Sequence, residues 1–337
     1  MIVMLTQTRI VLNTIIGLRA SGLGLLLALL LAGCSTVSVQ PDIPVGPGAT
    51  GGPEAPVTSV PPGVDPVQPP PPVVQMRPPR LGLALGGGAA RGFAHVGVIQ
   101  VLEQNGIRPD LVVGTSAGSL VAALYASGMN AAELERAALA MEEATLTDWT
   151  LPLLGRGMLR GEALGRYVRK AVNGRLIEQM QIPLGVLATD LSNGQGIVFR
   201  RGDTAQAVRA SSAVPGVFSP VPIAGRDYVD GGLVAPVPVR QAREMGAELV
   251  LAIDISSAPD GNRADGSLEV LLQTFAIMGQ SINRHELTGA DLVVRPALKG
   301  VGSADFAARK RSIEAGRLAM KAALPQLQAQ LARLRPR

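Results

Sequence analysis

Leu111-Val112-Val113-Gly114-Thr115-Ser116-Ala117-Gly118 is the stretch that most constrains the fold of this 337-residue chain. Its apolar start predicts a short buried strand, and the Ala- and Leu-rich run from Ser116 to Ser127 predicts a helix. Ser116 therefore falls on a strand-to-helix turn. Gly114 and Gly118 remove side chains where the backbones crowd together, so a strained serine can present its hydroxyl. The free amides and dipole at the helix start favour negative charge there, as a nucleophile requires.

A second glycine-rich turn lies upstream, in the run from Leu81 to Gly92, where an apolar strand leads into glycines and then a helix through Asn105. A phosphate loop would need Lys followed by Ser or Thr after the last glycine, and this chain has Phe93 and Ala94 instead. A dinucleotide fingerprint is disfavoured because alanines break its spacing and no acidic residue closes the following strand. An oxyanion hole fits best, because successive amides there face a serine one strand and one helix later.

The third feature is Asp230-Gly231-Gly232, which follows the predicted strand end at Tyr228-Val229. Such a sequence also suits an ordinary Asp-Gly hairpin turn. Its pairing with Ser116 and the glycine run favours a catalytic aspartate. An unperturbed carboxylate is a weak base toward an alcohol, so we expect partial desolvation and a close hydrogen bond to support it.

Together these motifs resemble the patatin-like phospholipases, bacterial branch, over roughly residues 81–324. The resemblance rests on motifs in the family's order: Gly86-Gly87-Gly88, Arg91-Gly92, His95-Val96-Gly97, Gly114-Thr115-Ser116-Ala117-Gly118, Ala188-Thr189-Asp190-Leu191, the run from Ala210 to Phe218, Asp230-Gly231-Gly232 and Pro236-Val237-Pro238. It implies a serine-aspartate dyad without a catalytic histidine or a cofactor, acting on lipid acyl esters such as membrane phospholipids.

By position in that motif, the resemblance implies that Ser116 is the nucleophile and Asp230 the general base. It implies an oxyanion site made by the amides of Gly86, Gly87, Gly88 and Ala89, with Arg91 nearby, and motif glycines Gly92, Gly114, Gly118, Gly231 and Gly232. Many members carry a fourth glycine where this chain has Ala89. An alanine still donates its amide, so only the backbone geometry at this position is in question.

The two histidines test an alternative triad, since an ordinary α/β hydrolase has the chain order serine, acid, histidine. His95 precedes Ser116 and fails this order, which favours a packed or capping role. His285 has the right order, with Asp230 or Asp254 as its acid, but its polar neighbours indicate a solvated helix face.

The start of the chain predicts export to a bacterial cell envelope. Basic residues precede the apolar run 23–32, which is shorter than the roughly 20 residues of a membrane span. Leu31-Ala32-Gly33-Cys34 resembles a bacterial lipoprotein signal, which implies that residues 1–33 are a signal peptide and that Cys34 is lipidated. An uncleaved anchor starting at Ile10 is the alternative. Cys34 is the single cysteine, so an intrachain disulfide is excluded. Ser35 favours attachment to the outer membrane, facing the periplasm or the surface.

Residues 34–80 are rich in Pro, Gly and Val and have no helical or strand period, which predicts a disordered tether. Residues 81–325 are the expected catalytic domain and residues 326–337 a helical tail. We predict an α/β fold: a single three-layer domain with a mainly parallel sheet between helices, patatin-like in architecture. The expected parallel strands are Leu81–Leu85, Leu111–Val113, Leu184–Ala188, Leu249–Ile253 and Leu292–Val294.

Other patterns bound the function. Residues 142–161 suit either a lid over an acyl site or ordinary packing, and leucines beyond Leu324 suit core packing or a partner helix. A net charge of +5 without aromatic platforms disfavours nucleic acid, and no metal-ligand spacing stands out. Oligomeric state is not indicated. A membrane-tethered lipoprotein that binds lipid or protein without turnover remains the alternative class of function.

Overall fold

The computed structural model describes residues 80–143, 148, 156–259 and 265–334. The predicted signal peptide, Cys34 and the tether lie outside these residues, as does most of the segment 142–161. Their assignments, and the domain boundaries drawn from them, stay predictions.

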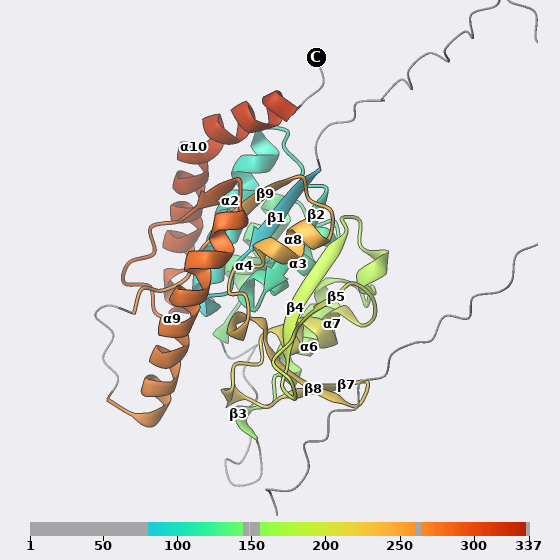
Figure 1. Ribbon diagram of the computed structural model, residues 1–337, viewed down its shortest axis with the longest axis vertical. Helices are drawn as coiled ribbons and strands as arrows, with labels where there is room; N and C mark the ends of the chain where they lie inside the picture. The colour runs from blue at the N-terminus through green and yellow to red at the C-terminus, as the bar shows by residue number, and fades with distance from the viewer. Residues whose placement is uncertain (1–79, 144–147, 149–155, 260–264, 335–337) are drawn as a thin grey trace, which may run out of the picture. The chain divides into compact units, whose positions relative to one another are not determined.

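A mixed eight-stranded sheet forms the centre of the fold, with the strand order β10-β9-β1-β2-β4-β8-β7 and β5 paired with β4 (Figure 1). Its strands are β1 (Leu81–Leu85), β2 (Leu111–Thr115), β4 (Leu184–Asp190), β5 (Gly196–Phe199), β7 (Val221–Ile223), β8 (Arg226–Asp230), β9 (Leu249–Ile253) and β10 (Leu292–Val294). The run from β10 to β4 is parallel throughout. All five predicted parallel strands are therefore confirmed.

Antiparallel strands occupy the other edge of the sheet. β8 pairs antiparallel with β4 and with β7, and β5 also pairs antiparallel with β4. β3 (Gly157–Leu159) and β6 (Gly216–Phe218) form a separate two-stranded sheet. The predicted set of strands did not include β3, β5, β6 or β7, because these pieces are three or four residues long and each contains a glycine or a proline.

Helices cover both faces of the sheet. They are α2 (Ala94–Gln104), α3 (Ala117–Ala126), α4 (Ala131–Ala140), α6 (Glu162–Ala171), α7 (Thr204–Ser211), α8 (Val239–Glu244), α9 (Ser267–Glu286) and α10 (Arg309–Leu334), with short 3-10 turns η1 (Ala89–Phe93), η2 (Ile177–Gln179), η3 (Gly231–Leu233), η4 (Leu287–Gly289) and η5 (Phe306–Ala308). The predicted helices after the glycine run and after Ser116 are confirmed. Helix α10 continues through Pro325, where the leucine pattern is interrupted.

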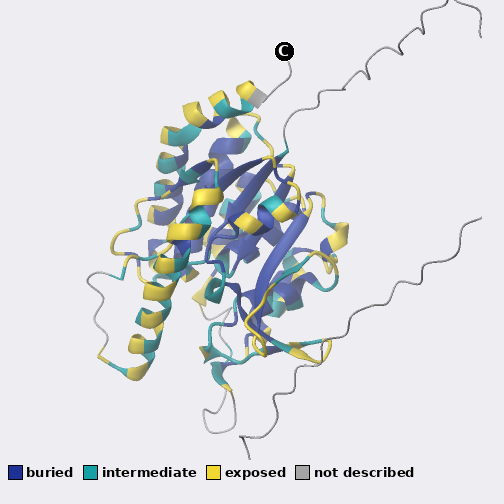
Figure 2. Cartoon of the chain, in the orientation of Figure 1, coloured by how far each residue is buried: buried dark blue, intermediate teal, exposed yellow. Residues whose placement is uncertain are grey.

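Alternation along each strand divides the core into two apolar layers, as expected for a sheet covered on both faces. On one face, Leu83 and Leu251 join a large cluster with residues of α2, α3 and α10. On the other, Ala84 and Val250 join a smaller cluster with residues of α8. Figure 2 shows the central strands as buried between these layers. The predicted three-layer α/β architecture is confirmed.

Helices α2 and α10 make an especially close contact, which depends on two glycines. A Cβ on Gly97 would lie 1.9 Å from the Ile313 carbonyl oxygen, and one on Gly316 would lie 1.9 Å from the Ala94 carbonyl oxygen. The two backbones therefore touch without intervening side chains. This contact fixes α2, whose first turn carries His95 against the glycine run.

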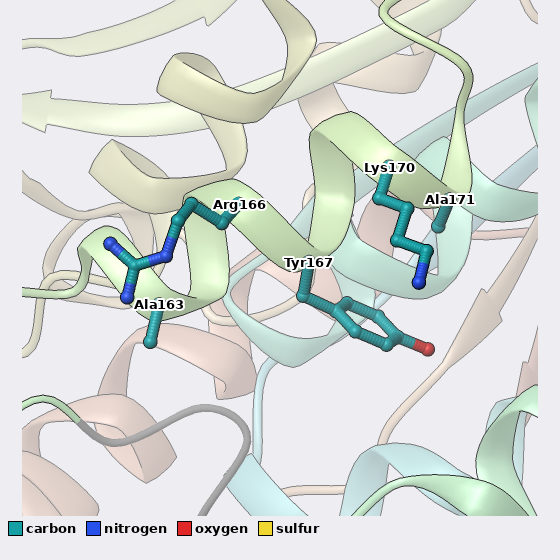
Figure 3. A pocket seen from close by; sticks show the side chains of 5 residues that line it. All are labelled: Ala163, Arg166, Tyr167, Lys170 and Ala171. Carbon is teal, nitrogen blue, oxygen red and sulfur yellow. The ribbon is translucent and has the colours of Figure 1, made fainter.

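Figure 3 shows a surface cavity on α6, lined by Ala163, Arg166, Tyr167, Lys170 and Ala171. None of these is a predicted site residue. In the described part of the chain no helix is long and apolar enough to cross a bilayer. The same residues contain no cluster of three or more His, Cys, Asp or Glu side chains arranged to hold a metal ion.

We predict that Gly316→Ala lowers the free energy of unfolding by about 1–3 kcal/mol or more, because its methyl group meets backbone that cannot move aside cheaply. Gly165→Ala is the matched control: it lies within α6, and its nearest neighbour, the Arg209 Cδ, would be 3.8 Å from the new Cβ. This control should gain about 0.5–1 kcal/mol from lower backbone entropy. Urea unfolding followed by circular dichroism measures both. An unchanged urea midpoint for Gly316→Ala would contradict the close-contact interpretation.

Candidate active site

Ser116 occupies the turn between β2 and α3 in a strained backbone conformation, with φ 53° and ψ −124°. Positive φ is uncommon for a residue other than glycine and is found at sites where surrounding structure enforces it. The Ser116 carbonyl accepts hydrogen bonds from the Ser119 amide at 2.8 Å and the Ser119 hydroxyl at 2.6 Å. The turn predicted at Ser116 is therefore present, and α3 begins directly after it.

A second serine holds this turn in place. The Ser116 amide donates to the Ser211 hydroxyl oxygen at 2.9 Å, and the Ser211 hydroxyl donates to the Leu187 carbonyl at 2.5 Å. Ser211 is fully buried at the end of α7. One hydroxyl therefore links the strained turn to strand β4. The sequence placed Ser211 in a family motif but assigned it no role, since nothing local indicates a contact across 95 positions.

Asp230 stands at the end of β8, opposite Ala188 of β4. Its amide donates to the Ala213 carbonyl at 2.9 Å, and its own carbonyl accepts from the Thr189 hydroxyl at 2.9 Å. Within the side chain, Oδ1 accepts from the Gly232 amide at 2.7 Å. The residue is 6% exposed, so backbone and carboxylate are both held within the protein.

The other carboxylate oxygen of Asp230, Oδ2, is buried and forms no hydrogen bond of good geometry within the described residues. Burial raises the pKa of Asp230 to about 6, while hydrogen bonding from the Ser116 side chain and the Gly232 amide opposes this rise. The Ser116 hydroxyl is therefore the neighbour that approaches the carboxylate, at a looser geometry than a formed hydrogen bond. Catalytic contacts of this kind commonly tighten only when substrate is bound. The structure thus brings Ser116 and Asp230 together, and their roles as nucleophile and base stay predictions.

The glycine run passes beside this pair. A Cβ on Gly87 would lie only 3.1 Å from the Ser116 Cβ. The Gly86 amide, however, donates to the Ile253 carbonyl at 3.0 Å, and the Gly87 amide donates to the Pro236 carbonyl at 2.9 Å. The expectation that these two amides serve an oxyanion is therefore wrong, because both are already engaged in holding the turn.

The amides of Gly88 and Ala89 remain. Neither has a hydrogen-bond partner among the residues that the structure covers. Ala89 has φ 50°, so the alanine adopts a left-handed conformation that glycine would adopt without strain. The sequence left the backbone geometry at Ala89 in question. In the structure this residue forms a strained turn, and its amide has no partner among the described residues.

Arg91 is buried, and its Nε has no partner within the described part of the chain. Burial lowers the pKa of Arg91, and the charge of Asp254 opposes this shift. The guanidinium therefore feels the negative charge of Asp254 just after β9, and no hydrogen bond joins it to Ser116 in the described region.

The motif glycines occupy positions where a side chain would clash. A Cβ would meet neighbouring atoms at 3.0 Å or closer at Gly92, Gly114, Gly118, Gly231 and Gly232.

The two histidines occupy contrasting environments. His95 is fully buried and donates through Nε2 to the Gly86 carbonyl at 2.8 Å. Burial lowers its pKa to about 4, so it is neutral near pH 7 and anchors the glycine run. His285 is exposed in the last turn of α9. No hydrogen bond in the described residues joins it to Asp230 or to Asp254, which pairs instead with Arg295 at 3.1 Å.

The arrangement combines a serine hydroxyl, a desolvated carboxylate with an open acceptor oxygen, and two free amides. These are the groups required for acyl transfer through a tetrahedral intermediate. Sequence reasoning missed the backbone supports, namely Ser211, Thr189 and the carbonyls of Pro236 and Ile253. Ser211, Thr189 and Pro236 lie in motifs whose pattern alone does not reveal these contacts, and Ile253 was indicated only as the end of a predicted strand.

Residues 83–243 match the family model described as patatin-like phospholipase. Over 204 residues the chain is 35% identical to an uncharacterized NTE family protein of Mycobacterium tuberculosis, covering 60% of this chain and 56% of that protein. Over 185 residues it is 35% identical to patatin-like phospholipase domain-containing protein 6 of Mus musculus, covering 52% of this chain and 14% of the mouse protein. The chain thus matches about half of the mycobacterial relative and a small part of the mouse one.

Among solved structures, the chain is similar to VipD from Legionella pneumophila, with a TM-score of 0.49 and 15% identity. The match covers 74% of this chain and 67% of VipD.

We predict that Ser211→Ala slows the reaction of Ser116 with a fluorophosphonate probe by roughly tenfold, the effect of losing about 1.4 kcal/mol of positioning energy. The Ser116 amide and the Leu187 carbonyl would both lose their partner. In ester turnover, kcat should fall while KM changes little, because the change affects the position of the nucleophile. Ser211→Thr, which keeps the hydroxyl, should restore part of the rate.

Ser212→Ala is the matched control, since it removes a neighbouring hydroxyl that makes no contact with the Ser116 turn in the described structure. Equal loss in both variants, or no rescue by threonine, would indicate a general packing effect rather than positioning.

Proposed function

We propose that this protein is a lipid acyl hydrolase that works through a Ser116-Asp230 dyad, and the match of residues 83–243 to the patatin-like phospholipase family model supports the proposal. The proposed substrates are membrane lipid esters, in a reaction of phospholipase A, lysophospholipase or esterase type. The chain's relatives support lipid hydrolysis at the level of the family.

One observation carries the dyad: the buried, unpartnered Oδ2 of Asp230 beside the strained Ser116 hydroxyl. A carboxylate with a pKa of about 6 is ionised at neutral pH yet is a stronger base than an exposed aspartate. A protein that only binds lipid has no need of a desolvated acid at this position. The pairing therefore supports catalysis over a binding-only role.

In the proposed acylation step, the Ser116 Oγ attacks the ester carbonyl carbon and its proton passes to the Asp230 Oδ2. The carbonyl oxygen becomes an oxyanion, which the Gly88 and Ala89 amides are available to stabilise. When the intermediate collapses, the bond to the alcohol breaks and the leaving oxygen takes the proton from Asp230. An acyl-enzyme at Ser116 remains.

Deacylation repeats these steps with water as the nucleophile. Asp230 accepts a proton from the water as its oxygen attacks the acyl carbon, and then returns a proton to the Ser116 Oγ. The fatty acid leaves and the dyad is regenerated. His95 takes no part in this sequence because its Nε2 is bound to the Gly86 carbonyl and its low pKa keeps it neutral.

We predict that kcat/KM for a soluble short-chain ester rises with pH through about 6 and then levels, since Asp230 must lose its proton to act as base. Asp230→Asn should lower turnover by roughly 10²- to 10⁴-fold, and Ser116→Ala should abolish both turnover and fluorophosphonate labelling. His285→Ala should leave rate and pH profile nearly unchanged. Loss of activity in His285→Ala with retention in Asp230→Asn would support the histidine triad instead.

We further propose that the enzyme is a lipoprotein of a bacterial cell envelope, attached through Cys34 and preferentially located at the outer membrane. Support comes from the sequence around Cys34 and from the proline-rich segment that follows it. A tether of this length would give the domain a high local concentration of membrane substrate without requiring high intrinsic affinity.

Expressed with its full leader in a bacterial host, the protein should incorporate labelled palmitate, and globomycin should block its processing. Cys34→Ala should lose both properties, because the lipid is attached to that thiol. Labelling that persists in Cys34→Ala would contradict this attachment site.

A further inference from the structure

Helix α9 carries an apolar surface that the described protein leaves uncovered. Of the eight exposed large apolar side chains in the described residues, four lie on this helix. Val270 and Ile277 are each 52% exposed, Met278 is 46% exposed and Leu272 is 37% exposed. Figure 2 shows α9 with exposed residues along most of its length. Such a concentration marks a surface that binds another phase or molecule.

The opposite face of α9 is occupied by the protein. Leu271 packs over Gly216, where a Cβ would lie 2.5 Å from the leucine Cδ2. About two turns further along the helix, Gly279 lies against Pro236. The Asn283 side-chain amide then donates to the Ser256 hydroxyl at 2.8 Å. These contacts fix the rotation of the helix. Val270 and Ile277 cannot turn inward without breaking them.

With this rotation fixed, the outward stripe is defined by Val270, Thr274, Ile277, Ser281 and Arg284, which recur at helical spacing. None of the five is acidic. Arg284 contacts only the Gln280 side chain, at 3.5 Å, so no carboxylate neutralises it in the described structure. The stripe therefore combines apolar side chains toward one end with an unneutralised cation at the other.

The stripe lies beside the candidate site. Helix α9 packs against η3, the turn that directly follows Asp230. It also touches Pro236, whose carbonyl holds the Gly87 amide. Figure 1 shows the amino-terminal half of α9 reaching beyond the sheet on the side where the parallel strands end. The helix that carries the stripe is thus in direct contact with two segments next to the candidate site, η3 and Pro236.

We propose that the α9 stripe docks the domain onto a phospholipid surface, with Val270 and Ile277 entering the headgroup region and Arg284 pairing with lipid phosphate. This inference rests on the proposed function, because a lipid ester held in a bilayer reaches Ser116 only if the domain settles on that bilayer. Apolar area supplies the main affinity of an interfacial helix, and basic side chains add attraction to anionic lipid. Both kinds of group are present on the stripe, and none of its five residues is acidic, although the exposed Glu269 flanks it at Val270.

The test compares binding to vesicles with catalysis on a soluble ester. Ser116→Ala, as a non-hydrolysing background, should float with vesicles of mixed phosphatidylcholine and phosphatidylglycerol. Adding Val270→Ser and Ile277→Ser should weaken this binding by on the order of tenfold or more, because the apolar insertion is lost. With Ser116 intact, the same pair should slow hydrolysis of vesicle lipid while turnover of a soluble short-chain ester stays unchanged.

Leu318→Ser is the matched control, since Leu318 is an exposed leucine, at 59%, on a helix other than α9. Its helix, α10, packs on the face of the sheet opposite to α8. This variant should alter neither binding nor vesicle hydrolysis. Arg284→Gln should weaken binding about fivefold with phosphatidylglycerol present and leave binding to pure phosphatidylcholine unchanged. These proteins lack the leader and Cys34, so that a lipid anchor does not mask the contribution of the helix.

Unaltered vesicle binding in the Val270/Ile277 double variant would overturn the proposal. So would a dimer in light scattering that the double variant converts to monomer without loss of vesicle binding, because the stripe would then be an interface between copies. Wild-type protein that binds vesicles through the stripe but hydrolyses neither vesicle lipid nor soluble ester would refute the proposed function and leave the docking surface intact.

Discussion

The site is organised around one constraint: a buried carboxylate, Asp230, that pairs with no cation in the described part of the chain. Asp230 is held by an amide at Oδ1, Oδ2 has no hydrogen-bond partner among the described residues, and burial raises the pKa of the carboxyl to about 6. Above that pH the Asp230 carboxyl is ionised in both states, and ionisation is easier in the unfolded chain. Its ionisation therefore lowers the free energy of unfolding by on the order of 3 kcal/mol. The penalty disappears as the pH falls through 6 toward the ordinary value, because the native carboxyl then becomes neutral. Strong local fixation is needed to keep such a group in place.

Hydrogen bonds from neighbouring segments of the sheet hold Asp230 and the Ser116 turn in place. Strand β4 is the centre of it, because Leu187 receives the Ser211 hydroxyl and Thr189 donates to the Asp230 carbonyl. The ion pair of the buried Asp190 with Arg226, at 2.8 Å, joins β4 to β8 near the same point. Hydrogen bonding from the Ser192 hydroxyl, followed by that from Arg226, lowers the pKa of Asp190 to about 2. The strained Ser116 turn and Asp230 are thereby both attached to the same strand, β4. Their relative position does not depend on a loop.

Much of this arrangement could be predicted from the sequence, and the reasons are local. A strand followed by a small-residue turn and a helix predicts the Ser116 conformation, and the apolar runs predict the five parallel strands. The antiparallel strands β5 and β7 were missed because their short segments lack a distinctive period. The engagement of the Gly86 and Gly87 amides was also missed, since their acceptors, Ile253 and Pro236, lie well over a hundred residues away. The function of Ser211 depends likewise on a contact between distant segments, which motif order does not reveal.

The left-handed backbone at Ala89 has a consequence for how firmly the glycine turn holds its shape. Glycine there would relieve a conformational strain of about 1–2 kcal/mol. It would also give the unfolded chain more freedom, which costs roughly 0.5–1 kcal/mol on folding. Since the second effect offsets about half of the first, the methyl group costs only a small part of the overall stability while narrowing the range of shapes open to the turn. The Gly88 and Ala89 amides, which have no hydrogen-bond partner among the described residues, are consequently presented by a stiffer piece of backbone than four successive glycines would form.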